Sequence, residues 1–146
     1  MPRLETNGIA DLCLDQMELG DSAGELMEKM LEAEAKVVQE AQQKTAKSMG
    51  VYDSSGRNVG GHIADSIQVS KTYKSADGAV QYVYPKGSRR RKNTTSSNSE
   101  IAFINEFGKR GQAPRPFIRT ANEMSAQAAV EAAEKVHDNF LRSKNL

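Results

Sequence analysis

SAGELMEKMLEAEAKVVQEAQQKTAKSMG, residues 22–50, is the stretch that decides the fold. Its apolar side chains recur at intervals of three and four residues, which is the spacing of one face of an α-helix. Ser22 and Glu25 form the S-x-x-E pattern of a capping box, and Gly50 is a natural helix stop. The sequence therefore predicts a helix over residues 22–49, roughly 42 Å long. A helix of that length in so small a chain should lie partly outside its own core.

Further helices are expected toward both ends of the chain. Residues 1–20 should form an N-terminal arm or a short separate helix, because Ile9 and Leu12 give only a partial apolar face. Pro116 begins a long C-terminal helix at the position that proline favours. The many alanines of that helix would let another helix approach closely. The 146 residues are enough for one modest core, so residues 1–146 are predicted to form a single domain.

Two β-prone stretches, residues 66–73 and 79–84, flank an Asp-Gly turn signal and predict a hairpin. A hairpin alone is marginally stable in water, so helices or more strands should cover it. The short apolar run EIAFINEF, residues 100–107, is compatible with either a helix or a strand. The predicted fold class is α+β. A small antiparallel sheet, made of the hairpin plus one or two further strands, packs against a long N-terminal helix and a long C-terminal helix.

A polar, basic stretch, PKGSRRRKNTTSSNS, occupies residues 85–99 and is expected to be a mobile loop. Its charge could be a solvated loop tip, a contact to another subunit, or a contact to phosphates that releases counterions. The loop lacks aromatic residues that would stack on single-stranded bases. Because of its basic charge, the alternative function is a nucleic-acid-binding module that uses residues 86–92. The candidate partner or subunit contacts are Arg89, Arg90, Arg91, Lys92, Lys109 and Arg110.

Charge is divided unevenly along the chain, although the net charge is only +1. Residues 1–49 carry ten acids and five bases, whereas residues 86–119 carry nine bases and two acids. Such a chain could stack an acidic face on a basic face of the next copy in an oligomer.

No pattern for catalysis or for metal binding is present. The chain has no G-x-x-x-x-G-K-S/T phosphate loop and no H-E-x-x-H motif. His62 and His137 fall in different predicted elements, and Cys13 is the only cysteine. Asp65 and Glu106 could be imagined as a carboxylate pair, but structural roles suit both better. We expect no catalytic residue, no metal, no cofactor and no enzyme. No signal peptide or membrane span is visible, which favours a soluble protein made in a cytoplasm.

Three short segments, in order, resemble one protein family. They are GHIADSI at 61–67, IAFINEFG at 101–108 and PRPFIRTA at 114–121. The chain resembles the head–tail connector (neck, tail-completion) proteins of long-tailed bacteriophages, whose motifs run G-x-L-x-x-S-I, then E-F-G, then P-F-h-R-P-A. The resemblance spans about residues 22–140. It departs from the family pattern at Ile63, Thr120 and Lys109, and in the long insert at 85–99.

The resemblance implies a ring, commonly of six subunits, at the junction between the tail tube and the head or collar. The implied partners are further copies of the chain, adjacent neck or tail-tube and terminator proteins, and DNA in passing, with no membrane. The implied location is the virion, with assembly in the host cytoplasm. Phe107 would anchor a turn in the core, Gly108 would allow the turn, and Phe117 would dock the last helix on the hairpin. The implied structural motif consists of Ser66, Ile67, Glu106, Phe107, Gly108, Pro116 and Phe117.

Overall fold

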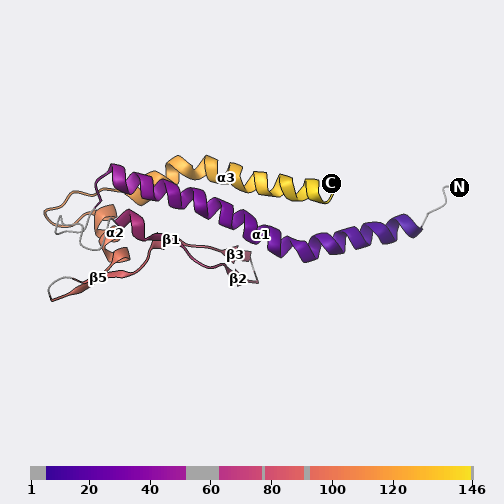
Figure 1. Ribbon diagram of the computed structural model, residues 1–146, viewed down its shortest axis with the longest axis horizontal. Coiled ribbons are helices and arrows are strands. Elements are labelled where there is room, and N and C mark those ends of the chain that lie inside the picture. The colour runs from indigo at the N-terminus through magenta and orange to yellow at the C-terminus, as the bar shows by residue number, and fades with distance from the viewer. Residues whose placement is uncertain (1–5, 52–62, 77, 91–92, 146) are drawn as a thin grey trace.

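The protein is an elongated α+β molecule (Figure 1), as expected from the sequence. The computed structural model describes residues 6–51, 63–76, 78–90 and 93–145, and for residues 6–19 and 21 it describes the backbone. The elements follow in the order α1 (Thr6–Ser48), η1 (Ile63–Ser66), β1 (Ile67–Val69), β2 (Tyr73–Ser75), β3 (Gly78–Val80), β4 (Val83–Pro85), β5 (Ser88–Arg90), β6 (Thr95–Ser97), α2 (Asn98–Phe107) and α3 (Phe117–Ser143).

The first helix is much longer than predicted. α1 has 43 residues, which makes it about 64 Å long. The expected separate arm or short helix at 1–20 is wrong from Thr6 onward, and so is the capping box, because Ser22 lies inside α1. The reason is that residues 6–21 include good helix formers and no proline, so the helix has no cause to begin anew at Ser22.

The predicted end of α1 at Gly50 is confirmed. Gly50 has a φ of 63°, the left-handed conformation that glycine adopts without a steric penalty. Its amide donates to the carbonyl of Lys47 at 3.2 Å, and the amide of Val51 donates to that of Ala46 at 3.0 Å. These two bonds make a Schellman motif, in which Val51 packs back into the core.

α3 packs antiparallel along the C-terminal part of α1 (Figure 1). The stripe of α3 that faces inward is spaced by four residues and, after Phe117, is made of small side chains. Small side chains let two helix backbones approach closely, as expected from the alanine content. Gln42 of α1 is buried in this interface and donates to Asn122 of α3 at 2.9 Å. The inward stripe is Phe117, Ala121, Ser125, Ala129 and Ala133.

The predicted hairpin is confirmed as an antiparallel ribbon of two ladders. β1 pairs with β4, and β2 pairs with β3. Between the ladders the register slips by one residue, so residues 70–72 face residues 81–82 in a β-bulge that bends the ribbon. The ribbon runs beside α1 (Figure 1), to which it is joined by an ion pair between Lys74 and Glu28.

The expectation of a polar loop over residues 85–99 needs correction. β5 and β6 pair antiparallel within it, with Arg89 opposite Ser96, and Asn98 already begins α2. The sheet is also not one unit, since the described strands form three two-stranded ladders. The sequence hid β5 and β6 because polar contacts, such as the one between Arg89 and Asn98, hold them in place of apolar alternation.

The main core lies where the C-terminal end of α1 meets η1, β1, α2 and the start of α3. Its largest fully buried side chains include Phe117, Ile63 and Ile67, each with no more than 1% of its surface exposed. Phe117 thus docks α3 in the core, as expected. The cluster is completed by Ala46, Val51, Ala64, Ile101 and Ala102. All of the motif segments that suggested the family border this cluster.

Candidate functional site

α2 carries one wall of the candidate site, and its first turn is capped locally. The Ser97 side chain accepts a hydrogen bond from the Glu100 amide at 3.0 Å, which satisfies one of the free N–H groups at a helix start. This cap settles the open choice for residues 100–107 in favour of a helix. Burial follows the helical period, because Ile101, Ala102 and Asn105 face inward.

Glu106, near the end of α2, caps the start of α3. Its Oε2 accepts from the Ile118 amide and its Oε1 from the Arg119 amide, both at 2.9 Å. Pro116 stands at the N-cap of α3 and makes no side-chain cap bond, so the cap comes from another helix. A carboxylate at a helix N-terminus is also favoured by the helix dipole. The E-F-G segment and the P-F-I-R segment are therefore joined by direct bonds.

The turn after α2 requires glycine. Gly108 has a φ of 76°, and a Cβ placed there would lie 2.9 Å from the Gln112 carbonyl oxygen. The neighbouring Phe107 does not anchor this turn in the core, contrary to expectation, because 67% of its surface is exposed. Phe107 is the last residue of α2, and its ring contacts that of Phe103 in a tilted arrangement, with 4.7 Å between the centroids. The core position is filled by Phe117 instead.

The connection between α2 and α3 also reaches α1. Nη1 of Arg115 donates to the Gly50 carbonyl oxygen at 2.9 Å, at the C-terminal end of α1. The Arg115 amide donates to the carbonyl of Asn105, whose buried side-chain amide bonds back to the carbonyl of Ile101. The segment from Gly108 to Pro116 therefore fixes the ends of three helices at one point.

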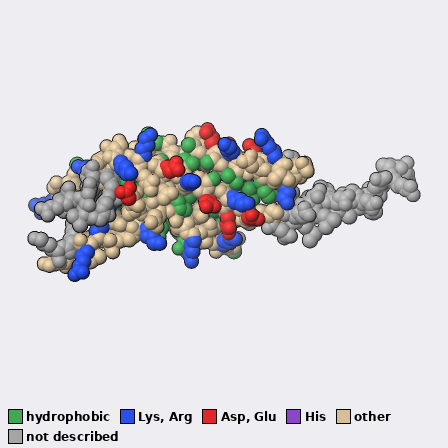
Figure 2. All heavy atoms as spheres, viewed as in Figure 1, with side chains coloured by type: hydrophobic (Ala, Val, Ile, Leu, Met, Phe, Trp, Pro, Cys, Tyr) green, Lys and Arg blue, Asp and Glu red, His purple; other side chains and the backbone are tan. Residues whose placement is uncertain are grey.

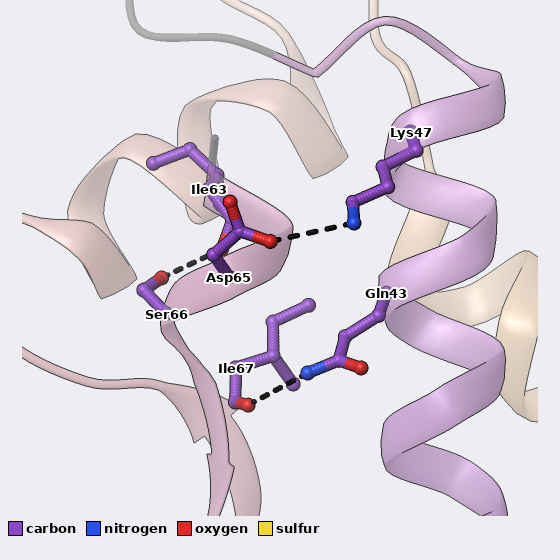
Figure 3. Close-up of polar contacts among 6 residues, drawn as sticks. All are labelled: Gln43, Lys47, Ile63, Asp65, Ser66 and Ile67. Atoms are coloured by element: carbon purple, nitrogen blue, oxygen red, sulfur yellow. Dashed lines mark hydrogen bonds and ion pairs between the residues drawn. The ribbon is translucent and has the colours of Figure 1, made fainter. Parts of the chain in front are cut away.

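Ser66 and Ile67 join the start of the ribbon to α1 (Figure 3). The Ser66 hydroxyl donates to the Ile63 carbonyl at 2.7 Å, within η1. The carbonyl of Ile67 accepts from the Gln43 side chain at 3.3 Å, while the Ile67 side chain is buried. Asp65 forms an exposed ion pair with Lys47 at 3.4 Å. These contacts position β1, and neither Ser66 nor Ile67 lies in an open site.

An apolar groove lies beside the α2–α3 junction, between β4, α2 and the first turns of α3. We call it the α2–α3 groove; its volume is about 740 Å³. Phe103 and Phe107 line it with 62% and 67% of their surfaces exposed, and Tyr84 is 37% exposed. Pro85 and Ala102 are buried beneath them. Exposed aromatic side chains around a hollow are typical of a binding surface.

The described basic candidates differ in how far they are exposed. Arg89 is only 7% exposed and donates from Nε to Asn98 Oδ1 at 2.9 Å, so it holds β5 to α2. Arg90 is exposed beside it. Lys109 and Arg110 are exposed in the turn after α2, where Lys109 bridges to Gln112. Arg91 and Lys92 lie outside the described residues.

The sequence does not identify three residues that matter in this region. Tyr84 falls in a predicted strand and Phe103 in an apolar run, and the pattern does not distinguish exposed rings from core rings. Asn98 bonds both to Arg89 and, through Nδ2, to the Lys86 carbonyl at 2.8 Å. Its signal was present, because it follows the Ser97 cap of an S-x-x-E motif.

The described side chains form no group that could hold a metal ion. In the part of the chain that the structure describes, no three His, Cys, Asp or Glu side chains gather as a metal site would require. On α3, Nδ1 of His137 lies 3.9 Å from Oδ1 of its neighbour Asp138. Cys13 and His62 fall outside the side chains described. Across the same described residues, no helix has the length and apolar character needed to cross a membrane.

Comparison with known proteins gives one match. A family model described as "Bacteriophage HK97-gp10, putative tail-component" matches residues 11–109, more than half of the chain. The match includes most of α1, the hairpin ribbon, β5, β6 and α2, and it ends directly after the E-F-G segment. No curated protein and no solved structure matches the chain significantly.

Proposed function

The chain belongs to the HK97-gp10-like family of bacteriophage tail components, and from that premise we propose that it is a ring-forming neck or tail-completion subunit. The family agrees with the resemblance to head–tail connector proteins in the sequence, and makes the chain a structural protein of the virion. The proposal adds that copies of the chain close into a ring, commonly of six, at the end of the tail tube.

The observation that carries this proposal is the family match over residues 11–109. Two features of the molecule support the ring. α1 continues well beyond the end of α3 (Figure 1), so part of it is not covered by its own helical partner. The α2–α3 groove exposes aromatic rings on a small domain with few aromatics. Both are usual for a chain that completes its packing with neighbours.

The experiment is a measurement of native mass on the purified full chain, by native mass spectrometry and negative-stain imaging. A closed ring of six would weigh about 96 kDa, six times the 16.0 kDa chain. A ring seen in 0.5 M salt without DNA supports the proposal. A monomer at every concentration up to about 100 µM would contradict it, since specific assemblies normally form well below that range.

The alternative is a nucleic-acid-binding module, and burial of Arg89 makes one of its candidate contact residues poorly accessible to a nucleic acid. Of the described residues in the basic run, Arg90 remains exposed. DNA binding by the isolated protein, with an affinity that falls steeply between 50 mM and 200 mM salt, would favour this alternative. Copurification with tail-tube or neighbouring neck proteins would favour the structural role.

A further inference from the structure

The N-terminal part of α1 and the helix α2 lie at opposite ends of the molecule (Figure 1). α2 lines the apolar groove, whereas that part of α1 is not covered by α3. The last turns of α3 lie beside Ser22 and Glu25 of α1, with which they line a shallow hollow. From there α1 continues for another four turns, back to Thr6. We call residues 6–21 the N-terminal extension. The α2–α3 groove is at the other end, where α1 stops.

We propose that the N-terminal extension of one copy docks in the α2–α3 groove of the next copy. This inference rests on the proposed ring, and it names the contact that would close it. The occupant of the groove is thus a helix of a second copy of this chain. Three independent features of the chain argue for it: the apolar pattern of the extension, its charge, and the placement of the two surfaces.

The sequence of the extension fits a helix that binds in a groove. Ile9 and Leu12 alone give only a partial apolar face, but on a continuous helix Cys13 and Met17 extend it. The four residues are spaced by three, one and four, which is the repeat of an apolar stripe on an α-helix. An amphipathic helix that inserts such a stripe between apolar walls is a recurrent mode of recognition. The groove supplies those walls with Phe103, Phe107 and Tyr84.

The charges of the two surfaces are opposite. The extension contains four acids and no lysine or arginine. Of the charged residues that line the groove, Arg119 forms an ion pair with Glu123 at 3.9 Å. Three more exposed bases lie close in sequence to lining residues: Lys86 follows Pro85, and Lys109 and Arg110 come soon after Phe107. Glu106 also lines the groove, but both of its carboxylate oxygens already accept hydrogen bonds from backbone amides of α3. On the face drawn in Figure 2, Lys and Arg are spread along the molecule and include the end that carries α2. The acids of the extension are Asp11, Asp15, Glu18 and Asp21.

The same charges disfavour the simplest other arrangement. Two extensions that paired with each other would place eight acids and no lysine or arginine on one pair of helices, and like charges close together cost free energy. An extension also cannot reach the groove of its own chain, because a continuous helix holds it at the far end. Contact between opposite ends of identical molecules is head-to-tail, and head-to-tail contacts close into rings when the rotation allows.

The lone cysteine of the chain gives a direct test. Cys13 lies in the extension, so a second cysteine in the groove, introduced as Phe107→Cys or Glu123→Cys, should form disulfides between copies under mild oxidation. We expect a ladder of covalent oligomers on non-reducing gels. The ladder should be absent when Cys13→Ser is added. It should also be absent when the second cysteine is introduced as Glu134→Cys, which lies exposed on α3 away from the groove.

A charge substitution gives a second, independent measurement. Phe103 is largely exposed, so Phe103→Asp should leave the fold intact while raising the dissociation constant of the assembly about thirtyfold, the effect of losing one interface hot spot. Val130→Asp, at another exposed apolar residue of α3, is the matched control and should leave association unchanged. Circular dichroism and thermal unfolding of both variants would confirm that they fold.

The outcomes separate this inference from the proposed function. A ring of normal mass that forms no disulfide with either groove cysteine and tolerates Phe103→Asp would overturn the docking but leave the ring. A wild-type chain that stays monomeric would overturn both. A ladder specific to the groove cysteines, together with weakened association of Phe103→Asp, would establish the contact.

Discussion

The carboxylate of Glu106 lies 2.9 Å from the backbone amide of Ile118, so α2 supplies the cap that α3 does not have in its own sequence. Proline occupies the N-cap of α3 and has no side-chain acceptor to offer. The bond therefore does two things at once. It satisfies free N–H groups at the start of α3, and it fixes the angle between the two helices that form the walls of the α2–α3 groove.

Glu106→Ala should lower the free energy of unfolding by about 1–2 kcal/mol, because two N–H groups of α3 lose a charged acceptor at the helix N-terminus. Urea unfolding followed by circular dichroism would measure the loss. Glu123→Ala is the matched control, since its ion pair with Arg119 is exposed and long, at 3.9 Å. That control should change stability by less than about 0.5 kcal/mol. Equal effects of the two variants would show that the cap contributes nothing special.

Gly108→Ala should destabilise the protein more than Gly111→Ala does. Both glycines have positive φ, 76° and 82°, so alanine pays a backbone cost of about 1–2 kcal/mol at either position. A Cβ at Gly108 would also collide with the carbonyl oxygen of Gln112 at 2.9 Å and the nitrogen of Pro114 at 3.0 Å, whereas at Gly111 it meets nothing. We expect Gly108→Ala to cost about 1 kcal/mol or more beyond Gly111→Ala in thermal unfolding. Similar melting temperatures would contradict the close approach at Gly108.

Elements with a strong local pattern were predicted well. The three- and four-residue repeat foretold α1 and α3, and Gly50 marked where α1 ends. Alternation around an Asp-Gly signal foretold the ribbon of β1 to β4, although its bulge was not visible in the pattern. These signals are local, so they can be read from neighbours in the chain.

Elements held by distant residues could not be predicted. β5 and β6 contain almost no apolar residues, and β5 is tied by Arg89 to Asn98 across nine positions. Phe107 and Phe117 both belong to the family motifs, yet Phe107 is exposed and Phe117 has no exposed surface. Only the packing of α2 against α3 decides which ring enters the core. The α2–α3 groove could not be predicted either, because its shape depends on how β4, α2 and α3 pack against one another.

Arg89→Met should destabilise the fold, although arginines in a basic run usually tolerate substitution. Its buried Nε–H group bonds to Asn98, which in turn bonds to Lys86. Removing it leaves Asn98 Oδ1 without this donor, at a cost of about 1–3 kcal/mol. Arg90→Met, at the exposed neighbour, should stay within about 0.5 kcal/mol of the parent in urea unfolding. If the two variants unfold alike, the hairpin of β5 and β6 is not anchored through Arg89.

The S-x-x-E motif occurs twice in the chain, and the structure gives the two copies opposite roles. Ser97 accepts from the Glu100 amide and caps α2, whereas Ser22 lies inside the continuous α1. Ser97→Ala should therefore cost about 1 kcal/mol, the usual loss of a cap. Ser22→Ala should be neutral or stabilise the protein by up to about 0.5 kcal/mol, because alanine is the better residue within a helix.

This pair of variants tests the length of α1 directly. If a helix began anew at Ser22, then Ser22→Ala would cost as much as Ser97→Ala, and residues 6–21 would not continue the axis of α1. The measurement is the difference in urea midpoint between each variant and the parent, with unchanged m-values showing that the extent of unfolding is the same. A loss of about 1 kcal/mol for Ser22→Ala would show that α1 is broken at Ser22. It would also remove the rigid connection that places the N-terminal extension away from the groove of its own chain.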